Sequence, residues 1–151
     1  MDKDELLKTL LNFRTKTYVA GTGKVKAAFD GSVQYEHQEG NWSYRDIYFI
    51  GSGIFPGLET LSYKGKPVWS MSYYGNFSSM TEEQADTMLR KALTDTWETT
   101  RIYNHVEKNF GDFTYICDGD GDIDELSGTE EILVDGKQVY FFYYAGGYIG
   151  D

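Results

Sequence analysis

The feature that most constrains this chain is an internal repeat, which places residues 40–75 over residues 111–146 at an offset of 71 and without a gap. Nine of the 36 aligned pairs are identical, and they fall on turn glycines and on one strand pattern. We therefore predict that the two segments form the same structural unit twice, within a single domain of residues 1–151. The identical pairs are Gly40/Gly111, Tyr44/Tyr115, Gly57/Gly128, Glu59/Glu130, Gly65/Gly136, Lys66/Lys137, Val68/Val139, Tyr73/Tyr144 and Gly75/Gly146.

Each copy has the pattern of an antiparallel hairpin. The dipeptides Lys64-Gly65 and Asp135-Gly136 occupy the places of two-residue type I′ turns, which need positive φ at both central residues. Such turns oppose Leu61 to Val68, Ile132 to Val139, Thr60 to Trp69 and Glu131 to Tyr140. One face then carries Trp69, Met71 and Tyr73 or Tyr140, Phe142 and Tyr144, and the other carries Glu59, Leu61 and Val68 or Glu130, Ile132 and Val139. Neither face is cleanly polar, so we expect both to be at least partly covered.

Two helices are expected beside these strands. Asp2 or Asp4 can cap the first, over about residues 4–14, and Thr81 with Gln84 makes a capping box for the second, over about residues 81–97. A short strand is expected near residues 17–20, then a loop over 21–32, and further strands at about 33–38, 42–50, 58–63, 67–74, 112–117, 129–134 and 138–145. The predicted fold is α+β, with two repeated antiparallel β-meander units forming a curved sheet or open barrel, an N-terminal helix and one long connecting helix.

Composition excludes several classes of protein. The net charge of −10, without a basic run, argues against direct nucleic-acid binding. The single cysteine rules out an internal disulfide, and no stretch is long and apolar enough to span a membrane. The acidic N-terminal stretch does not match a signal peptide, so we expect a cytoplasmic protein. The 3 Trp, 13 Tyr and 9 Phe favour strands, because aromatic rings pack well on a pleated surface.

The acidic run "CDGDGDIDELSGTEEI" at 117–132 resembles a calcium loop without matching one. Asp118, Asp120 and Asp122 fall at ligand positions 1, 3 and 5 of a helix-loop-helix calcium site. Ile123 stands where that loop needs a glycine, and Thr129 stands where it needs the bidentate glutamate. In the repeat this run lies on the passage between two strands, so we interpret it as a solvated connection and expect no metal and no cofactor.

Catalytic patterns are mostly missing. The stretch "AGTGKVK" lacks the first glycine and the final Ser/Thr of a phosphate loop. His37 and His105 stand apart from each other and show no zinc spacing with Cys117, which aligns with Asp46 in the repeat. Asp46 and Glu59 remain as a possible acid/base pair for a small enzyme.

The aromatic strands give the main functional lead. Tyrosine and tryptophan combine apolar area with a hydrogen-bonding tip, which suits a ligand pocket or a protein interface, although such residues also form ordinary cores. The candidate ligand-binding residues are Tyr44, Asp46, Trp69, Met71 and Tyr73. Glu59 and Glu130 are expected to be structural carboxylates, hydrogen-bonded by Tyr44 and Tyr115 respectively.

The first copy also resembles a known family. The motifs "W-x-Y-R-D-x-Y-F-x-G", "F-x-G-x-E" and "Y-K-G-K-P-V-W-x-M-x-Y-Y-G", beginning at Trp42, Phe55 and Tyr63, are similar to domain-of-unknown-function family 5680. Later motifs "G-D-F-x-Y", residues 128–132 and "Y-x-G-G-x-I" extend the resemblance over nearly the whole chain, and the acidic run at 118–125 departs from it. The resemblance implies a bacterial cytoplasmic protein. The family also occurs fused behind helix-turn-helix domains, which implies a sensor or interaction role; this chain carries no such domain.

These observations predict a non-catalytic small-ligand-binding or protein-interaction module, regulatory or sensory in role, for an unspecified small molecule or protein. The alternative is a small enzyme that uses Asp46 and Glu59. An enclosed apolar pocket with convergent polar groups would favour a ligand. An exposed aromatic patch would favour a protein partner, and two close carboxylates with opposed pKa shifts would favour an enzyme.

Overall fold

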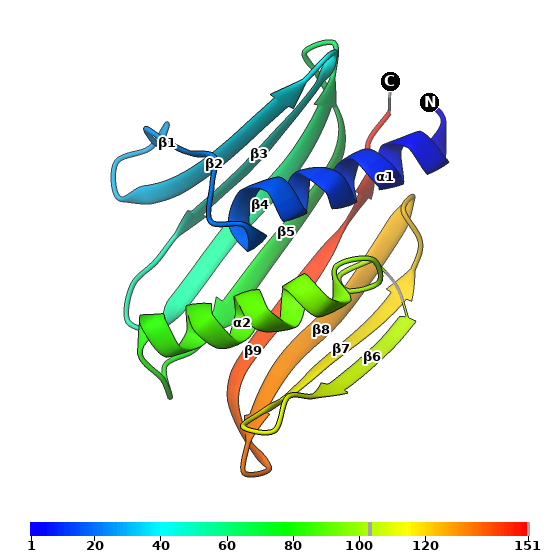
Figure 1. Cartoon of the computed structure of the whole chain (residues 1–151). Coiled ribbons are helices and arrows are strands. Elements are labelled where there is room, and N and C mark those ends of the chain that lie inside the picture. Colours follow the sequence, from blue (N-terminus) through cyan, green and yellow to red (C-terminus); the bar gives the residue numbers. More distant parts are fainter. Residues whose placement is uncertain (103, 151) are drawn as a thin grey trace.

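A computed structural model describes residues 1–102 and 104–150 and has an α+β fold (Figure 1). Nine antiparallel strands form one sheet in the order β1-β2-β3-β4-β5-β9-β8-β7-β6, which is not closed into a barrel. The helical elements are α1 (Lys3–Arg14), the π-helix η1 (Thr15–Val19) and α2 (Glu82–Thr96). The strands are β1 (Lys24–Val25), β2 (Ser32–Glu39), β3 (Trp42–Phe49), β4 (Ile54–Tyr63), β5 (Lys66–Asn76), β6 (Asn104–Asn109), β7 (Thr114–Gly121), β8 (Glu125–Val134) and β9 (Lys137–Tyr148).

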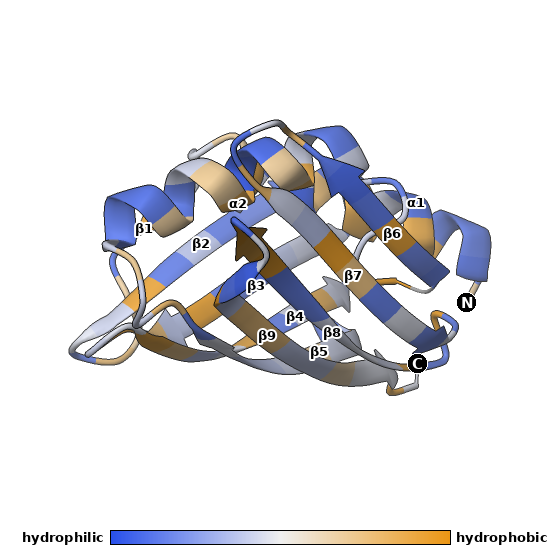
Figure 2. Cartoon of the chain, turned by 90° about the horizontal axis from the view of Figure 1, so that it is seen from below, coloured by the Kyte–Doolittle hydropathy of each residue, from blue (hydrophilic) through white to orange (hydrophobic). Residues whose placement is uncertain are grey.

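The molecule has two layers. Both helices lie on the same face of the curved sheet, and no helix of the described residues lies on the other face (Figure 2). The core fills the space between the layers and includes residues of both helices and of the central strands, among them Leu6, Leu10, Phe13, Leu61, Trp69, Leu89, Tyr115, Ile132 and Phe142. No helix within residues 1–102 and 104–150 has the length and apolar character needed to cross a membrane.

The two helices begin where the sequence predicts. The Asp2 side chain accepts hydrogen bonds from the backbone N–H groups of Asp4 and Glu5, so it caps α1. Thr81 and Gln84 form the expected capping box at the start of α2. The α2 stripe that faces the sheet is buried and consists of Ala85, Leu89, Ala92 and Leu93, flanked by the partly buried Met88 and Trp97.

Three-stranded meanders on the two sides of the sheet have matching registers. In β3–β4, Asp46 pairs with Glu59, and in β7–β8, Cys117 pairs with Glu130, so each partner shifts by 71 residues. Both predicted type I′ turns are present, with φ of 50° and 77° at residues 64 and 65 and of 50° and 73° at residues 135 and 136. Strands β5 and β9 join the two sides at the middle of the sheet, where Tyr73 pairs with Tyr144.

A register shift in each hairpin corrects the predicted pairing. The register changes between Leu61 and Ser62 in β4, and again between Ile132 and Leu133 in β8. Leu61 therefore pairs with Trp69 rather than Val68, and the equivalent positions shift in the same way: Ile132 pairs with Tyr140, Thr60 with Ser70 and Glu131 with Phe141. A bulge adds one residue to one strand and so reverses the side to which the residues beyond it point. The two sets of side chains that were predicted on opposite faces therefore lie on the same face. The glutamates and the aromatic residues therefore share the face that the helices cover.

Two local predictions were wrong, and two strands were missed. Residues 17–20 do not form a strand, because the chain continues from α1 directly into η1. Strands β1 and β6 were not predicted, since both are exposed edge strands without apolar alternation. The acidic run is not a free connection: it lies mostly on β7 and β8, and only residues 122–124 turn between them. There the Asp122 side chain accepts hydrogen bonds from the backbone of Asp124 and Glu125.

Candidate functional site

Glu59 is the centre of a buried polar cluster beneath α1. Its side chain lies on the covered face of β4, and only 4% of the residue is exposed. Arg14, the last residue of α1, reaches down to it with two hydrogen bonds, from Nε to Oε1 at 2.8 Å and from Nη2 to Oε2 at 2.6 Å. The Tyr44 hydroxyl donates to Oε1 at 2.5 Å, as predicted. Burial opposes ionisation of Glu59, but the Arg14 charge and these hydrogen bonds outweigh it and hold its pKa below the ordinary value.

Glu130 has an equivalent environment on β8 and is 1% exposed. Arg101, which follows α2, donates from Nε to Oε2 at 2.8 Å and from Nη2 to Oε1 at 2.7 Å. The Tyr115 hydroxyl donates to Oε2 at 2.5 Å, again as predicted, and the Tyr140 hydroxyl donates to Oε1 at 2.7 Å. Each buried carboxylate is thus held by one forked arginine and by tyrosine, which is the arrangement that a buried charge requires.

Sequence reasoning found the tyrosine donors and missed both arginines. The tyrosines recur at the repeat offset, so the pattern identifies them. Arg14 and Arg101 are 87 residues apart, which does not match that offset, and they come from the end of α1 and from the turn after α2 rather than from the strands. The sequence indicated these arginines only indirectly, because a buried carboxylate needs a cation nearby.

Asp46 differs from both glutamates because no cation in the described part of the chain pairs with it. It lies opposite Glu59 in the β3–β4 register and is 7% exposed. Its Oδ1 accepts a hydrogen bond from the Tyr73 hydroxyl at 2.5 Å. Burial, followed by repulsion from the Glu59 charge, raises the pKa of Asp46 from 3.8 to about 7. The two neighbouring carboxyl groups therefore have pKa values displaced in opposite directions.

Cys117 occupies the corresponding place in the other half of the sheet. It pairs with Glu130 as Asp46 pairs with Glu59, and its Sγ lies 3.6 Å from the Tyr144 hydroxyl. The arginine, glutamate and tyrosine framework therefore forms around a thiol side chain as well as around a carboxyl. It follows that this framework does not require Asp46.

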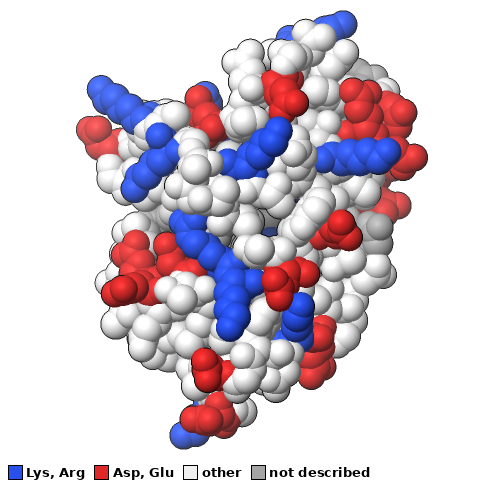
Figure 3. Space-filling view, in the orientation of Figure 1, with Lys and Arg blue, Asp and Glu red and all other residues white. Residues whose placement is uncertain are grey.

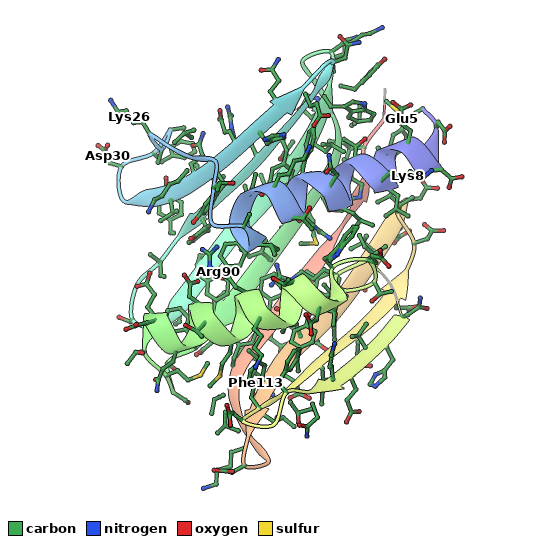
Figure 4. The ribbon with its side chains drawn as sticks, viewed as in Figure 1. Glu5, Lys8, Lys26, Asp30, Arg90 and Phe113 are labelled. Atoms are coloured by element: carbon green, nitrogen blue, oxygen red, sulfur yellow. The ribbon has the colours of Figure 1, made fainter. Side chains whose placement is uncertain are left out.

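A cavity lies between the sheet and α2 and contains Asp46 at its wall. Its volume is about 80 Å³. The surface above it is hollowed between α1 and α2 (Figure 3), and Arg90 extends from α2 toward the end of α1 beside this gap (Figure 4). The lining includes Arg14, Tyr44, Asp46, Tyr48, Phe55, Glu59, Tyr73, Phe77, Glu82, Ala85, Asp86, Trp97, Arg101, Tyr140 and Phe142.

The comparisons with known proteins give a family. A family model described as "Domain of unknown function (DUF5680)" matches residues 46–149 of the 151. The chain belongs to the DUF5680 family. The match begins at Asp46 and includes Glu59, Arg101 and Glu130, whereas Arg14 and Tyr44 precede it. No curated protein and no solved structure matches the DUF5680 chain significantly.

The predicted ligand-binding residues of this DUF5680 chain divide into two groups. Tyr44, Asp46 and Tyr73 line the cavity. Trp69 and Met71 are fully buried and do not line it. The Arg14 guanidinium lies 5.5 Å from the centre of the Trp69 ring and donates to the Met71 sulfur at 3.6 Å, so both residues support the Glu59 cluster. The indole Nε1 of Trp69 is the one fully buried side-chain polar atom of the described residues without a hydrogen-bond partner.

Metal-ligating side chains do not cluster in the described part of the DUF5680 chain. Within residues 1–102 and 104–150, no three His, Cys, Asp or Glu side chains are placed to hold an ion. The acids of the 117–132 run have local partners instead: Asp118 contacts His105, and Asp124 contacts Lys3.

Proposed function

We propose that this protein is a non-catalytic small-ligand-binding module and that its ligand occupies the cavity beneath α2. The single observation that carries the proposal is Asp46, a carboxyl group buried without a cation at the wall of an aromatic-lined cavity. Burying an unpaired carboxyl is costly, and the equivalent Cys117 position avoids that cost. The Asp46 carboxyl lowers the stability of the fold and lines a cavity, and a ligand that binds to it explains both facts.

The outer face of the sheet supports a protein partner less strongly. Among the described residues, the exposed Tyr74 and Tyr143 pair across β5 and β9, and both rings contact that of the partly buried Phe141. A small group of exposed apolar residues is ordinary on a protein surface and needs no partner to explain it. The cavity combines enclosure, apolar lining and convergent polar groups, so it carries the proposal.

Filling the cavity tests this function. Ala85 of α2 lines the cavity and is buried, so Ala85→Leu should occupy the ligand's space. Ala145→Leu is the matched control, because Ala145 is exposed on β9 and does not line the cavity. A compound present at 100 times its dissociation constant stabilises the fold by about 2.7 kcal/mol, which raises the melting temperature by roughly 5–10 °C for a chain of this size.

A thermal-shift screen of small molecules should therefore give hits for the wild type and for Ala145→Leu that disappear in Ala85→Leu. Native mass spectrometry of the purified protein provides a second readout of bound small molecules. Hits that persist unchanged in Ala85→Leu would place binding elsewhere and refute the proposed site.

The alternative is a small enzyme, and the opposed pKa shifts of Asp46 and Glu59 favour it. A carboxyl with a pKa of about 7 is suited to general acid/base catalysis at neutral pH. Glu59, however, accepts hydrogen bonds from Arg14 on both oxygens and from Tyr44 on one. It is therefore not free to react, and its charge acts by raising the pKa of Asp46. Turnover of a cavity ligand that is abolished by Asp46→Asn, without loss of binding, would support this alternative.

We also propose that β3–β4–β5 and β7–β8–β9 are two copies of one meander unit. The equal offsets of their registers, the paired bulges and the matching type I′ turns support this interpretation. We propose a cytoplasmic location and a regulatory or sensory role for the ligand-binding module. Direct nucleic-acid binding is not part of the proposal, because the net charge of −10 would repel phosphate.

A further inference from the structure

We propose that the ligand of this cavity is a compact organic cation, an amine whose ammonium group pairs with the Asp46 carboxylate and whose apolar body lies among aromatic rings. This inference rests on the proposed ligand-binding function and specifies its ligand class. Four separate features support this ligand class: the charges of the cavity wall, the hydrogen bonding of Asp46, the arrangement of the aromatic rings and the volume of the cavity.

The charges of the cavity wall are unbalanced in the direction that suits a cation. Both arginines in the lining are already neutralised, Arg14 by Glu59 and Arg101 by Glu130. Two further carboxyl groups of the lining, those of Asp46 and Glu82, have no cation partner among the described residues, whereas Asp86 is paired with Arg90. An anionic ligand would meet this excess of carboxylates, whereas a cation would be attracted, and the net charge of −10 adds to that attraction.

Asp46 has one oxygen available to a ligand. Oδ1 is taken by the Tyr73 hydroxyl, and no hydrogen bond to Oδ2 occurs within residues 1–102 and 104–150. Asp46 is one of the residues that line the cavity. A donor group of the ligand can reach Oδ2, and an ammonium group would also supply the missing positive charge.

Aromatic rings surround the rest of the cavity. Phe55 is the centre of a cluster in which its ring lies 6.2 Å from that of Tyr73, 5.9 Å from that of Phe77 and 6.0 Å from that of Phe142. Aromatic faces attract cations and pack against apolar groups. The cluster thus suits both the apolar body of an amine and the carbon atoms next to its charged nitrogen.

The cavity volume limits the ligand to a small molecule. One water-sized group needs about 10–15 Å³ of such a volume. The volume of about 80 Å³ therefore accommodates roughly five to eight such groups. This matches a compact alkylamine or arylalkylamine, and it is too small for a peptide or a nucleotide.

Binding of a cation at Asp46 should depend on pH. The titratable and charged groups around Asp46 are Tyr44 and Tyr48 of β3, Glu59 of β4, Tyr73 of β5, Arg14 of α1, Arg101 after α2, and Glu82 and Asp86 at the cavity wall. The pKa of Asp46 itself lies near 7. An amine that stays protonated throughout should therefore bind more tightly as pH rises from 5 to 8, with release of a proton from Asp46.

Three probes of similar size and different charge test the inference: benzylamine, benzyl alcohol and benzoate. Affinities are measured by titration calorimetry at pH 8 and pH 5 for the wild type, Asp46→Asn and Asp46→Cys, the last reproducing the side chain at Cys117. We expect benzylamine to bind the wild type most tightly at pH 8. Either substitution should weaken benzylamine about 10- to 100-fold, the range of a charge-assisted hydrogen bond, and leave benzyl alcohol unchanged.

The outcomes separate this inference from the proposed function. Benzyl alcohol or benzoate binding as tightly as benzylamine, with loss of binding in Ala85→Leu, would overturn the cation class and keep the ligand-binding function. Equal benzylamine affinity in the wild type and both Asp46 variants would also overturn the cation class. If none of the probes binds to the wild type at millimolar concentration, the cation class is refuted, and the ligand-binding function is decided by the thermal-shift screen of wild type and Ala85→Leu.

Discussion

Replacing Asp46 by asparagine should make the protein more stable, and increasingly so as pH rises. The folded pKa of Asp46 is about 7, against 3.8 for an ordinary aspartate, so the folded state binds the proton more strongly than the unfolded state does. The contribution of Asp46 to stability is therefore fully present below pH 3.8 and is lost as pH rises through 7. Each unit of pKa shift corresponds to about 1.36 kcal/mol, so the full loss above pH 7 is about 4 kcal/mol.

The measurable quantity is the difference in free energy of unfolding between Asp46→Asn and the wild type. With these two pKa values, that difference should grow by about 2–3 kcal/mol between pH 5 and pH 8. Urea titrations at several pH values give it directly, and other titrating groups cancel in the subtraction. A difference that stays constant across this range would refute the assignment of a raised pKa to Asp46. It would also show that the Asp46 carboxyl imposes no cost on the fold.

Three further predictions concern the framework and the acidic turn. Glu59→Ala should lower the free energy of unfolding by about 3–5 kcal/mol in urea titrations, because it leaves the Arg14 charge buried and unpaired. A loss below about 1 kcal/mol would contradict a structural role. Gly57→Ala should cost about 1–3 kcal/mol by calorimetry, because a Cβ there overlaps the Tyr73 ring; unchanged stability would mean that the ring moves freely. Millimolar Ca²⁺ should leave the melting temperature unchanged, since the Asp122 side chain is engaged by backbone N–H groups; a rise of several degrees that a chelator reverses would contradict this.

Local sequence patterns predicted the parts of the fold that depend on neighbouring residues. Asp-Gly and Lys-Gly adopt type I′ turns because glycine tolerates positive φ and a two-residue loop demands it, so both hairpins could be located. The Thr81 capping box fixed the start of α2 for a similarly local reason. The π-helix at Thr15–Val19 was missed because its residues read as a β-branched strand, while continuity with α1 decided the outcome.

The candidate site was only partly predictable, because most of its chemistry joins segments that are distant in the chain. The Tyr44–Glu59 contact could be predicted, since both residues have identical counterparts 71 positions later in the sequence, Tyr115 and Glu130. The position of Arg14 over Glu59 depends on how α1 lies across the sheet, which no spacing encodes. The bulge next to Leu61 could not be seen either, because one extra residue leaves the turn signal intact while it moves every side chain beyond it.

The central pairing of β5 with β9 has a consequence for how the chain folds. Every other neighbouring pair in the sheet joins strands that follow one another in sequence, so those contacts form across short connections. The β5–β9 pairs, from Asn76↔Phe141 to Trp69↔Tyr148, join residues 65 to 79 positions apart. Closing such a loop costs on the order of 2–3 kcal/mol more chain entropy than closing a short turn. The strands β1–β5 and the strands β6–β9 can therefore pair early and independently of each other. The rate of folding should be set by the step in which β5 and β9 pair.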